Sequence, residues 1–422
     1  MKLDARRAIE ALRAGVPNGD AVRFLGANQE DIIDRFSAGL LVASGEREKS
    51  DSRGFILEGE FGSGKSHVLR ALKEEAKRQN FACSLVVVSK ETPLSDLDAV
   101  YKAAIRELTL PDRQGGDLNE VVLRLDQRSE QYGRFYQWIV SGDSHLDPLF
   151  AATLLLYQRL AGDSELRDAI QNFWAGSRVN ISQLKKELKY LGEAGHGLTL
   201  RSRKNADLAW ERFSFAARLI RAAGYKGWVL LLDEIELIAQ FPLLGRARSY
   251  AGLMRLLGYD DEAAPNLYTV AAATEEFSGN VLQEKRDEVK IAERLAAKDP
   301  TLAARAQRAL KEVIDESVGP WEHVNKQKPD DLDRAYAEIR ELYRLAFDWE
   351  GRRRERPPSR DEGRSMRMHV REWITRWDLE RLDPSYDAAI DFEALRPDLQ
   401  EREGLEGLSE PEDEGTAAAA AG

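Results

Sequence analysis

Cysteine is almost absent from this sequence of 422 residues, with Cys83 as the single example. One cysteine excludes an internal disulfide bond and any zinc site built from several thiolates. The five histidines are scattered and show no metal-ligand spacing. Because chains without disulfides suit a reducing compartment, we expect a cytoplasmic location.

Long apolar runs are also missing. The longest, such as residues 229–232, are far shorter than the ~20 residues that a membrane-spanning helix needs. Near the N-terminus, Asp4 and Glu10 fall where a signal peptide would need its apolar core. We therefore expect a protein that neither spans a membrane nor is exported.

An excess of positive charge is lacking as well. The chain has 62 Lys and Arg residues against 73 Asp and Glu residues, which gives a formal charge of -11. Contact with nucleic acid would therefore need a local basic patch rather than the whole surface. The 43% of hydrophobic residues indicates a globular protein, and the length is sufficient for two or three structural units.

A complete phosphate-loop motif is present at residues 59–66, GEFGSGKS. An apolar run precedes it and a helical pattern follows, which is the context that this motif requires. Its glycines let backbone N–H groups surround an anion, and the helix adds the positive end of its dipole. We expect Lys65 to contact the β- and γ-phosphates of ATP and Ser66 to bind Mg²⁺; the alternative is an ordinary glycine-rich turn. The candidate ATP-binding residues are Gly59, Glu60, Phe61, Gly62, Ser63, Gly64, Lys65, Ser66 and His67.

Two carboxylates, Asp233 and Glu234, follow the apolar run of residues 229–232. In nucleoside triphosphatases the first residue of such a pair holds Mg²⁺ and the second polarises the attacking water. The alternative for Asp233 is a helix cap. Small GTPases use a different water-positioning residue, and the acceptor pocket of a nucleotide kinase is not recognisable. The pair therefore favours hydrolysis.

Four short apolar runs predict strands, at residues 55–57, 82–89, 228–232 and 267–273. Helical periodicity separates them, which favours a parallel sheet covered on both faces. Only helical periodicity is present between about residues 94 and 224 and after about residue 276. We therefore expect an α/β P-loop NTPase fold with a long helical insertion and a C-terminal helical lid.

Six segments follow from this pattern. We expect an N-terminal helical arm over 1–48, the two parts of the ATPase core over 49–93 and 225–298, a helical insertion over 94–224, a helical lid domain over 299–403 and a disordered acidic tail over 404–422.

Several segments together resemble the BrxD-type ATP-binding proteins of BREX bacteriophage-resistance systems. They are ARRAIEALRAGVPNGDAVRFLG, GFILEGEFGSGKSHVL, SKETPL, VLLLDEIE and SMRMHVREWITRWDLERL. The resemblance covers most of residues 5–382. It implies a P-loop ATPase of the AAA+ type, with an AAA+/ORC-like fold, that works in a defence cluster beside a helicase and DNA-modifying components.

The AAA+ type implies further site residues. Thr274 follows the strand after the Asp-Glu strand, where such ATPases place a polar contact to the γ-phosphate or to the attacking water; the alternative is a residue that starts a turn. A neighbouring subunit usually supplies an arginine, for which Arg286 and Arg294 are the nearest candidates. Arg367 or Arg364 could instead sense the γ-phosphate from the lid. Solvated surface charge is the alternative for these arginines.

Arginine is concentrated in residues 351–376, a segment that could contact the DNA backbone or form a solvated loop. Our first hypothesis is an ATPase of a bacterial anti-phage defence system that couples ATP turnover to assembly on DNA, directly or through a helicase partner, with a homo-oligomer as one possible state. The alternative is an ATP-dependent regulatory switch or scaffold that binds a helicase or other partner and hydrolyses little ATP. Stimulation of turnover by DNA would separate the two.

Overall fold

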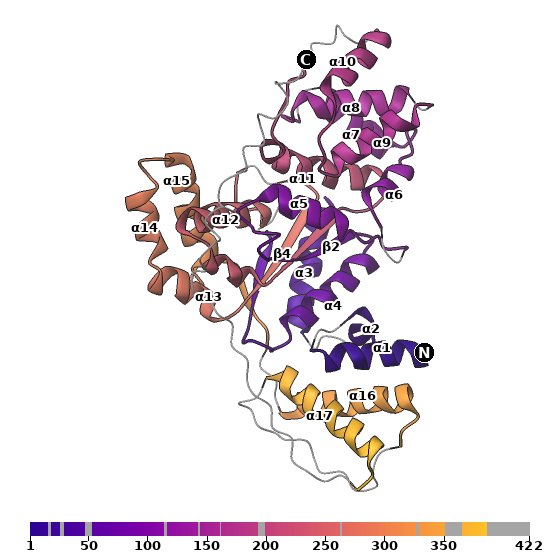
Figure 1. Ribbon diagram of the computed structural model, residues 1–422, viewed down its shortest axis with the longest axis vertical. Helices are drawn as coiled ribbons and strands as arrows, with labels where there is room; N and C mark the ends of the chain where they lie inside the picture. The colour runs from indigo at the N-terminus through magenta and orange to yellow at the C-terminus, as the bar shows by residue number, and fades with distance from the viewer. Residues whose placement is uncertain are drawn as a thin grey trace, which may run out of the picture.

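The computed structural model describes residues 1–15, 18–25, 29–46, 53–113, 116–141, 144–160, 162–192, 199–261, 264–325, 329–350 and 365–385. Figure 1 shows a central sheet with a lobe of helices at each end of the long axis. The arginine-rich residues 351–364, with Arg364, and the acidic tail at 404–422 lie outside the described residues. In the parts described, no helix combines the length and apolarity that crossing a membrane would require.

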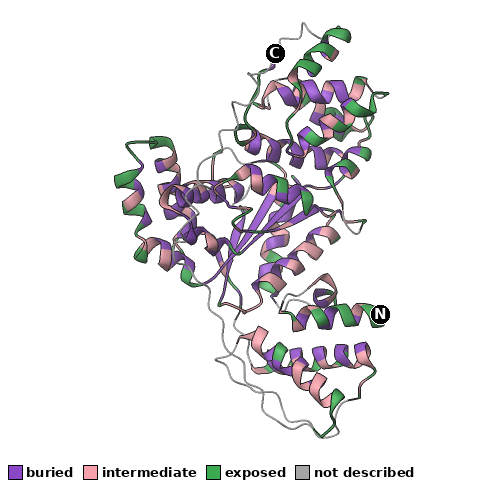
Figure 2. Cartoon of the chain, viewed as in Figure 1, coloured by how far each residue is buried: buried purple, intermediate pink, exposed green. Residues whose placement is uncertain are grey.

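The central sheet has five parallel strands in the order β2-β3-β4-β1-β5. The strands are β1 (Phe55–Glu58), β2 (Ala82–Val87), β3 (Trp228–Asp233), β4 (Leu267–Ala273) and β5 (Trp321–His323). Every residue of β1 and β3 is buried, because helices cover both faces of the sheet (Figure 2). The expected α/β class, the parallel sheet and the four strands predicted from apolar runs are confirmed.

The expectation of an entirely helical chain after about residue 276 is wrong at β5. This strand pairs with β1, with Ile56 opposite Trp321 and Glu58 opposite His323. The sequence pattern missed it because three residues with one large apolar side chain show no periodicity. A hydrogen bond fixes the side chain of Trp321: its indole N–H donates to the Val313 carbonyl oxygen at 2.9 Å.

Two helices cover one face of the sheet, α3 (Glu30–Ala43) and α4 (Lys65–Arg78). Alternate strand residues point to them: Phe55 and Leu57 share a buried cluster with Phe36 of α3 and Leu69 of α4. Ile56, between them, belongs to the cluster on the opposite face. This two-residue period is what a strand buried on both faces imposes.

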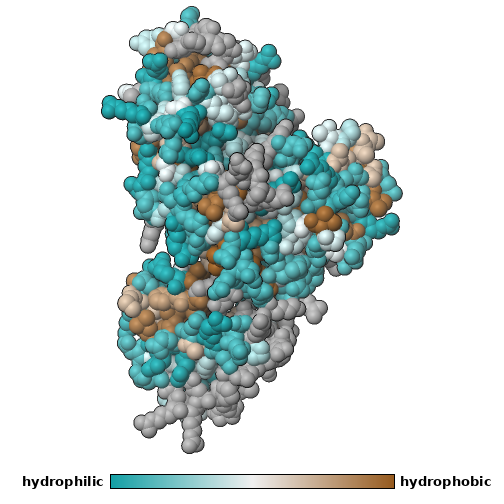
Figure 3. Space-filling view, turned by 180° about the vertical axis from the view of Figure 1, so that it is seen from behind, coloured by the Kyte–Doolittle hydropathy of each residue, from teal (hydrophilic) through white to brown (hydrophobic). Residues whose placement is uncertain are grey.

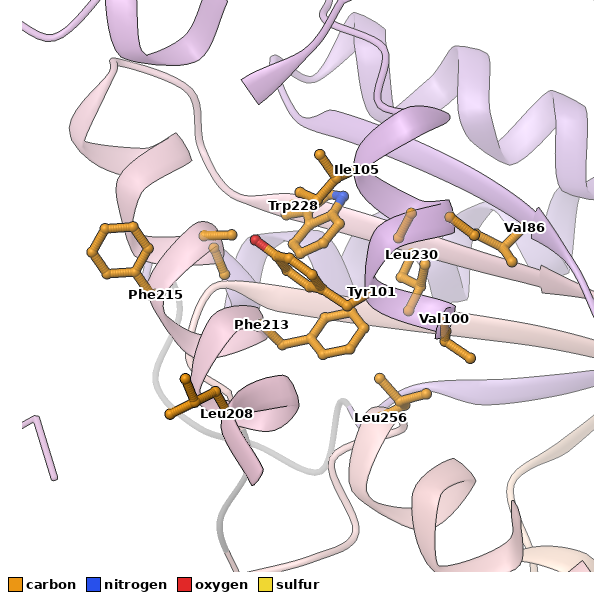
Figure 4. Packing of buried hydrophobic residues seen from close by; sticks show 14 of the residues in the cluster. Val86, Val100, Tyr101, Ile105, Leu208, Phe213, Phe215, Trp228, Leu230 and Leu256 are labelled. Atoms are coloured by element: carbon orange, nitrogen blue, oxygen red, sulfur yellow. The ribbon is translucent and has the colours of Figure 1, made fainter. Parts of the chain in front are cut away.

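The opposite face carries helices of the expected insertion and of the second part of the core. The insertion contains α5 (Leu97–Arg106), α6 (Leu118–Leu123), α7 (Glu130–Val140), α8 (Pro148–Arg159), α9 (Ser164–Trp174), α10 (Ile181–Tyr190) and α11 (Asn205–Ala222). Figure 4 shows Tyr101 of α5 and Phe213 of α11 against Trp228 of β3. Their ring centroids lie 5.1 to 6.3 Å apart. These aromatic contacts attach the insertion to the sheet.

The helical segments that come after β3 and after β4 in the chain form a third group, which we call the side layer. It contains the 3₁₀ helix η1 (Ile235–Gln240), α12 (Leu243–Leu256), α13 (Glu276–Gly279), the π-helical turns η2 (Asn280–Glu284) and η3 (Leu310–Ile314), α14 (Asp287–Arg294) and α15 (Pro300–Ala309).

The last lobe joins both ends of the described chain. It contains α1 (Lys2–Arg13), α2 (Gly19–Leu25), α16 (Pro329–Phe347) and α17 (Met366–Leu382). Ile9 of α1 shares a buried cluster with Ile339 of α16 and with Trp373 and Trp377 of α17. Apolar side chains gather where this lower lobe meets the central body (Figure 3). The N-terminal helices thus pack against the helices expected to form a lid.

Candidate nucleotide-binding site

The phosphate-loop residues connect the carboxyl end of β1 to the first turn of α4. Gly62 and Gly64 have left-handed φ values of 84° and 108°, which favour glycine. A Cβ on Gly59 would lie 2.6 Å from Ser63 Oγ, and one on Gly62 would lie 2.8 Å from Ser365 Oγ. Positive φ values at Gly62 and Gly64 and the close approach of a serine to Gly59 and to Gly62 therefore explain why glycine stands at these positions.

Lys65 is buried at the start of α4. Its Nζ donates to the carbonyl oxygen of Gly59 at 2.7 Å and to that of Glu60 at 3.0 Å. Burial lowers the pKa of Lys65, while the Glu236 and Asp233 carboxylates act in the opposite direction. The ammonium is therefore folded back onto its own loop.

The two predicted carboxylates lie at the end of β3. Asp233 is buried, and its Oδ1 accepts the backbone N–H of Glu234 at 3.0 Å. Glu234 has a left-handed φ of 62° and an exposed side chain. Partial desolvation, with the adjacent Asp233 carboxylate, raises the pKa of Glu234. A left-handed backbone at a residue other than glycine is strained, and such strain clusters at functional sites.

A pocket at this edge of the sheet brings most of the predicted residues together. Its lining includes Phe61, Gly62, Ser63, Gly64, Lys65, Ser66, His67, Asp233, Glu234 and Arg367. Gly59 and Glu60 are outside that lining and contribute the carbonyl oxygens that hold Lys65. The carboxyl edge of a parallel sheet is where ligands of such folds bind.

Among the candidate arginines that the structure describes, Arg367 is the one that lines the pocket. Its backbone N–H donates to the Gly62 carbonyl at 3.3 Å, and its guanidinium carbon lies 4.9 Å from the centre of the Phe61 ring. Its positive charge adds to the lowering of the pKa of Lys65 and opposes the raising of the pKa of Glu234. The guanidinium therefore acts electrostatically on both groups. The start of α17 thus lies against the phosphate loop.

The other two described arginine candidates, Arg286 and Arg294, are exposed on or beside α14 and do not line the pocket. Thr274 does not line it either. It comes directly after β4, whose last residue pairs with Glu58, and it is fully buried. Within the described residues its hydroxyl has no hydrogen-bond partner.

The pocket also contains residues that the sequence analysis missed. Glu236, three residues after Asp233, is buried and lines it. A third acidic residue in DEIE was a signal for Glu236. The side chain of Gln29 lines the pocket too, and its Oε1 accepts the backbone N–H of Asn325 at 3.1 Å. Apart from Phe61 and Val68, the apolar part of the lining comes from distant segments and has no local signal: Leu12, Leu25, Val324, Ala335, Ile339, Met366 and Val370.

Glu58, the last residue of β1, was missed as well. It is 1% exposed, and His323 Nδ1 lies 2.7 Å from its Oε2. Burial, with the nearby Glu316 and Glu275 carboxylates, raises the pKa of Glu58 to about 8. The carboxyl group under the phosphate loop therefore keeps its proton at neutral pH.

The donor set of the pocket fits Mg²⁺ beside a polyphosphate. The Ser66 hydroxyl and the Asp233 carboxylate both line it, and Mg²⁺ prefers oxygen ligands completed by water and substrate phosphates. Lys65, Ser66 and the backbone of the loop would meet the phosphates themselves.

Comparison with known proteins agrees with this geometry. A family model described as "BREX system ATP-binding protein BrxC/D" matches residues 2–314, well over half of the chain. A comparison with curated proteins finds no match. The matched range contains the phosphate loop, Asp233, Glu234 and the first four strands of the sheet. The chain therefore belongs to the BrxC/D family of BREX-system ATP-binding proteins.

Proposed function

We propose that this chain binds ATP with Mg²⁺, hydrolyses it, and couples turnover to assembly on DNA or on DNA-acting partners of the defence system. Membership of the family supports ATP binding within a BREX system. The observation that carries the further step is the convergence of Lys65, Asp233, Glu234 and Arg367 on one pocket.

The proposed roles follow from the positions of these side chains. Lys65 would exchange its loop carbonyls for the β- and γ-phosphates, and Ser66 and Asp233 would hold Mg²⁺, which neutralises phosphate charge when bound. Glu234, exposed at the mouth of the pocket, would orient the attacking water and take up its proton. Arg367 would contact the γ-phosphate from the start of α17.

The apolar part of the pocket suits the base of the nucleotide. Leu12, Leu25 and Ile339 come from α1, α2 and α16 and would contact the faces of the ring. The side-chain amide oxygen of Gln29 already accepts the backbone N–H of Asn325. The side-chain NH₂ group of Gln29 is therefore left to donate to a ring nitrogen of the base.

The order of the strands supports the AAA+ assignment, since β4 lies between the phosphate-loop strand β1 and the Asp-Glu strand β3. The N-terminal and SKETPL segments support the BrxD type within the family. Arg286 and Arg294 are exposed, so a homo-oligomer could present either one to the pocket of a neighbour. Thr274 would then complete the γ-phosphate contacts after a local rearrangement.

The test measures phosphate release by the full chain with Mg²⁺ and ATP, alone and with single- or double-stranded DNA, together with the mass of the ATP-bound particle. We expect turnover that DNA increases, and we expect Lys65→Ala to weaken ATP binding substantially and so to lower turnover. Wild-type protein without measurable ATP binding would overturn the proposal.

One observation favours a regulatory switch as a second candidate. The pocket is lined by the N-terminal helices α1 and α2 and also by α16 and α17, so a bound nucleotide would bridge both terminal segments. Such a switch would show slow turnover that DNA does not change, but ATP would protect the terminal segments from proteolysis.

A further inference from the structure

Glu236 is a pocket residue that the proposed hydrolysis leaves without a role. It belongs to η1, and its side chain is 4% exposed. Its Oε2 has no hydrogen-bond partner in the described part of the chain. A buried carboxylate oxygen without a partner is costly, so a function in another state of the site would explain its presence.

Lys65, a buried cation that lines the same pocket, is available to become that partner. A lysine ammonium has three N–H donors, and two of them contact the carbonyl oxygens of Gly59 and Glu60. Burial lowers the pKa of Lys65, and several carboxylates oppose this shift. Glu236 opposes it most, ahead of Asp233. Lys65 and Glu236 line the same pocket. Contact with both the β- and γ-phosphates takes two of the three donors, so Lys65 must then leave at least one loop carbonyl.

We propose that Glu236 is a positioning residue: it accepts a hydrogen bond from Lys65 when the ammonium leaves the loop carbonyls for the phosphates. This inference rests on the proposed ATP site. Glu236 then replaces a lost carbonyl contact and keeps the buried ammonium paired on the side away from the phosphates. Burial raises the pKa of Glu236 to about 7, and the Lys65 ammonium favours its ionised form. The ionised carboxylate lowers the cost of moving Lys65, because a buried charge without partners is unfavourable.

A purely repulsive Glu236 would act in the opposite direction. A carboxylate close to a polyphosphate should weaken binding by like-charge repulsion, and its removal should then strengthen binding. The sign of the change in ATP affinity therefore separates the two roles.

The experiment measures the dissociation constant for Mg²⁺-ATP in the full chain by calorimetry, with competition titrations where binding is weak. We expect Glu236→Ala to weaken binding about 10-fold, the size of one charge-assisted hydrogen bond. Glu236→Gln should recover part of the loss, because its amide oxygen still accepts a hydrogen bond. In the Lys65→Ala background, Glu236→Ala should cause no further loss of ATP affinity, since Glu236 acts on ATP binding through Lys65.

Unchanged or tighter binding by Glu236→Ala would overturn the inference, and so would equal losses in the wild-type and Lys65→Ala backgrounds. Glu211→Gln is the matched control: Glu211 is a half-buried glutamate of α11 outside the pocket lining, and its substitution should leave the affinity unchanged. If the wild-type chain does not bind Mg²⁺-ATP, the proposed function fails together with this inference. If the wild type binds and the Glu236 variants bind equally well, only the inference fails.

Discussion

The charged residues of the pocket act on one another at close range. Lys65 is buried beneath the loop, Glu234 is exposed, and both are influenced by Arg367. Their different exposure suits different tasks: a buried cation for phosphate, and an accessible carboxylate for water. Substitutions should therefore separate binding from turnover.

Glu234→Gln should preserve ATP binding and reduce turnover by roughly 10²- to 10⁴-fold, the usual contribution of a general base. The amide keeps the shape of the side chain but cannot accept the proton of the attacking water. Calorimetry and phosphate release on the same preparation check both parts. Loss of ATP binding in this variant would instead give Glu234 a structural role.

The raised pKa of Glu58 predicts that the stability of the folded chain depends on pH. Its pKa is about 8 in the folded chain and 4.5 for an ordinary glutamate, so between these values the native state binds a proton that the unfolded state has released. The free energy of unfolding should therefore fall as the pH rises from about 4.5 to about 8. One pKa unit corresponds to ~1.4 kcal/mol, so Glu58→Gln should stabilise the chain by at least ~1 kcal/mol at high pH.

Urea unfolding of wild type and Glu58→Gln on both sides of this range checks the slope. Glu293→Gln, which changes an exposed glutamate of α14, should behave like the wild type. Parallel pH profiles for Glu58→Gln and wild type would contradict the assignment.

At the scale of elements, helix ends and helix pairs are held by defined side chains. Six insertion helices begin at residues whose side chains accept backbone N–H groups, namely Asp96, Asp117, Ser129, Asp147, Asp163 and Asn180. In the side layer, Arg246 of α12 is paired with Asp287 of α14 through two contacts of 2.7 Å, and the Tyr250 hydroxyl donates to the same carboxylate at 2.6 Å. All three side chains are at most 1% exposed.

Asp287→Ala should destabilise the chain by about 3–5 kcal/mol, because it leaves the Arg246 guanidinium buried without its carboxylate. Glu130→Ala provides the comparison, since Glu130 forms an exposed ion pair with Arg134 on α7. That change should cost at most ~1 kcal/mol. Chemical denaturation measures both, and a similar small effect for the two variants would contradict the importance of the buried pair.

At the scale of the whole molecule, the net charge of -11 opposes binding of DNA over the whole surface. The local exception in the sequence is the segment of residues 351–376, most of which lies outside the described residues. Contact with DNA, if direct, would therefore be concentrated and sensitive to salt.

Replacing Arg352, Arg353 and Arg354 together with alanine should weaken DNA binding and reduce the dependence of affinity on salt. Each lost phosphate contact lowers the log-log salt slope by about one unit. Fluorescence anisotropy at several salt concentrations gives both quantities. Unchanged affinity and slope would indicate a solvated loop, whereas intact DNA binding with lower ATP turnover would connect these arginines to the nucleotide.

Local sequence determined the parts of the site that are contiguous. The phosphate loop and the Asp-Glu pair each occupy a few consecutive residues after an apolar run, and the structure confirms strands at β1 and β3 before them. Such runs are recognisable because burial on both faces selects apolar side chains at every position. The loop glycines were recognisable because their backbone geometry excludes other residues.

Tertiary structure decided everything that depends on distant segments meeting. The three-residue strand β5 exists through its pairing with β1, and the apolar wall of the pocket joins α1 and α2 to α16 and α17. Sequence left Arg286 and Arg294 as candidates for a neighbouring subunit's arginine and Arg367 or Arg364 as candidates for a lid sensor. The packing of α17 brings Arg367 to the phosphate loop. Glu236 became notable through burial without a partner. Residue type and spacing specify local backbone geometry, but proximity across hundreds of residues arises from the packing of helix and sheet faces, which no short pattern encodes.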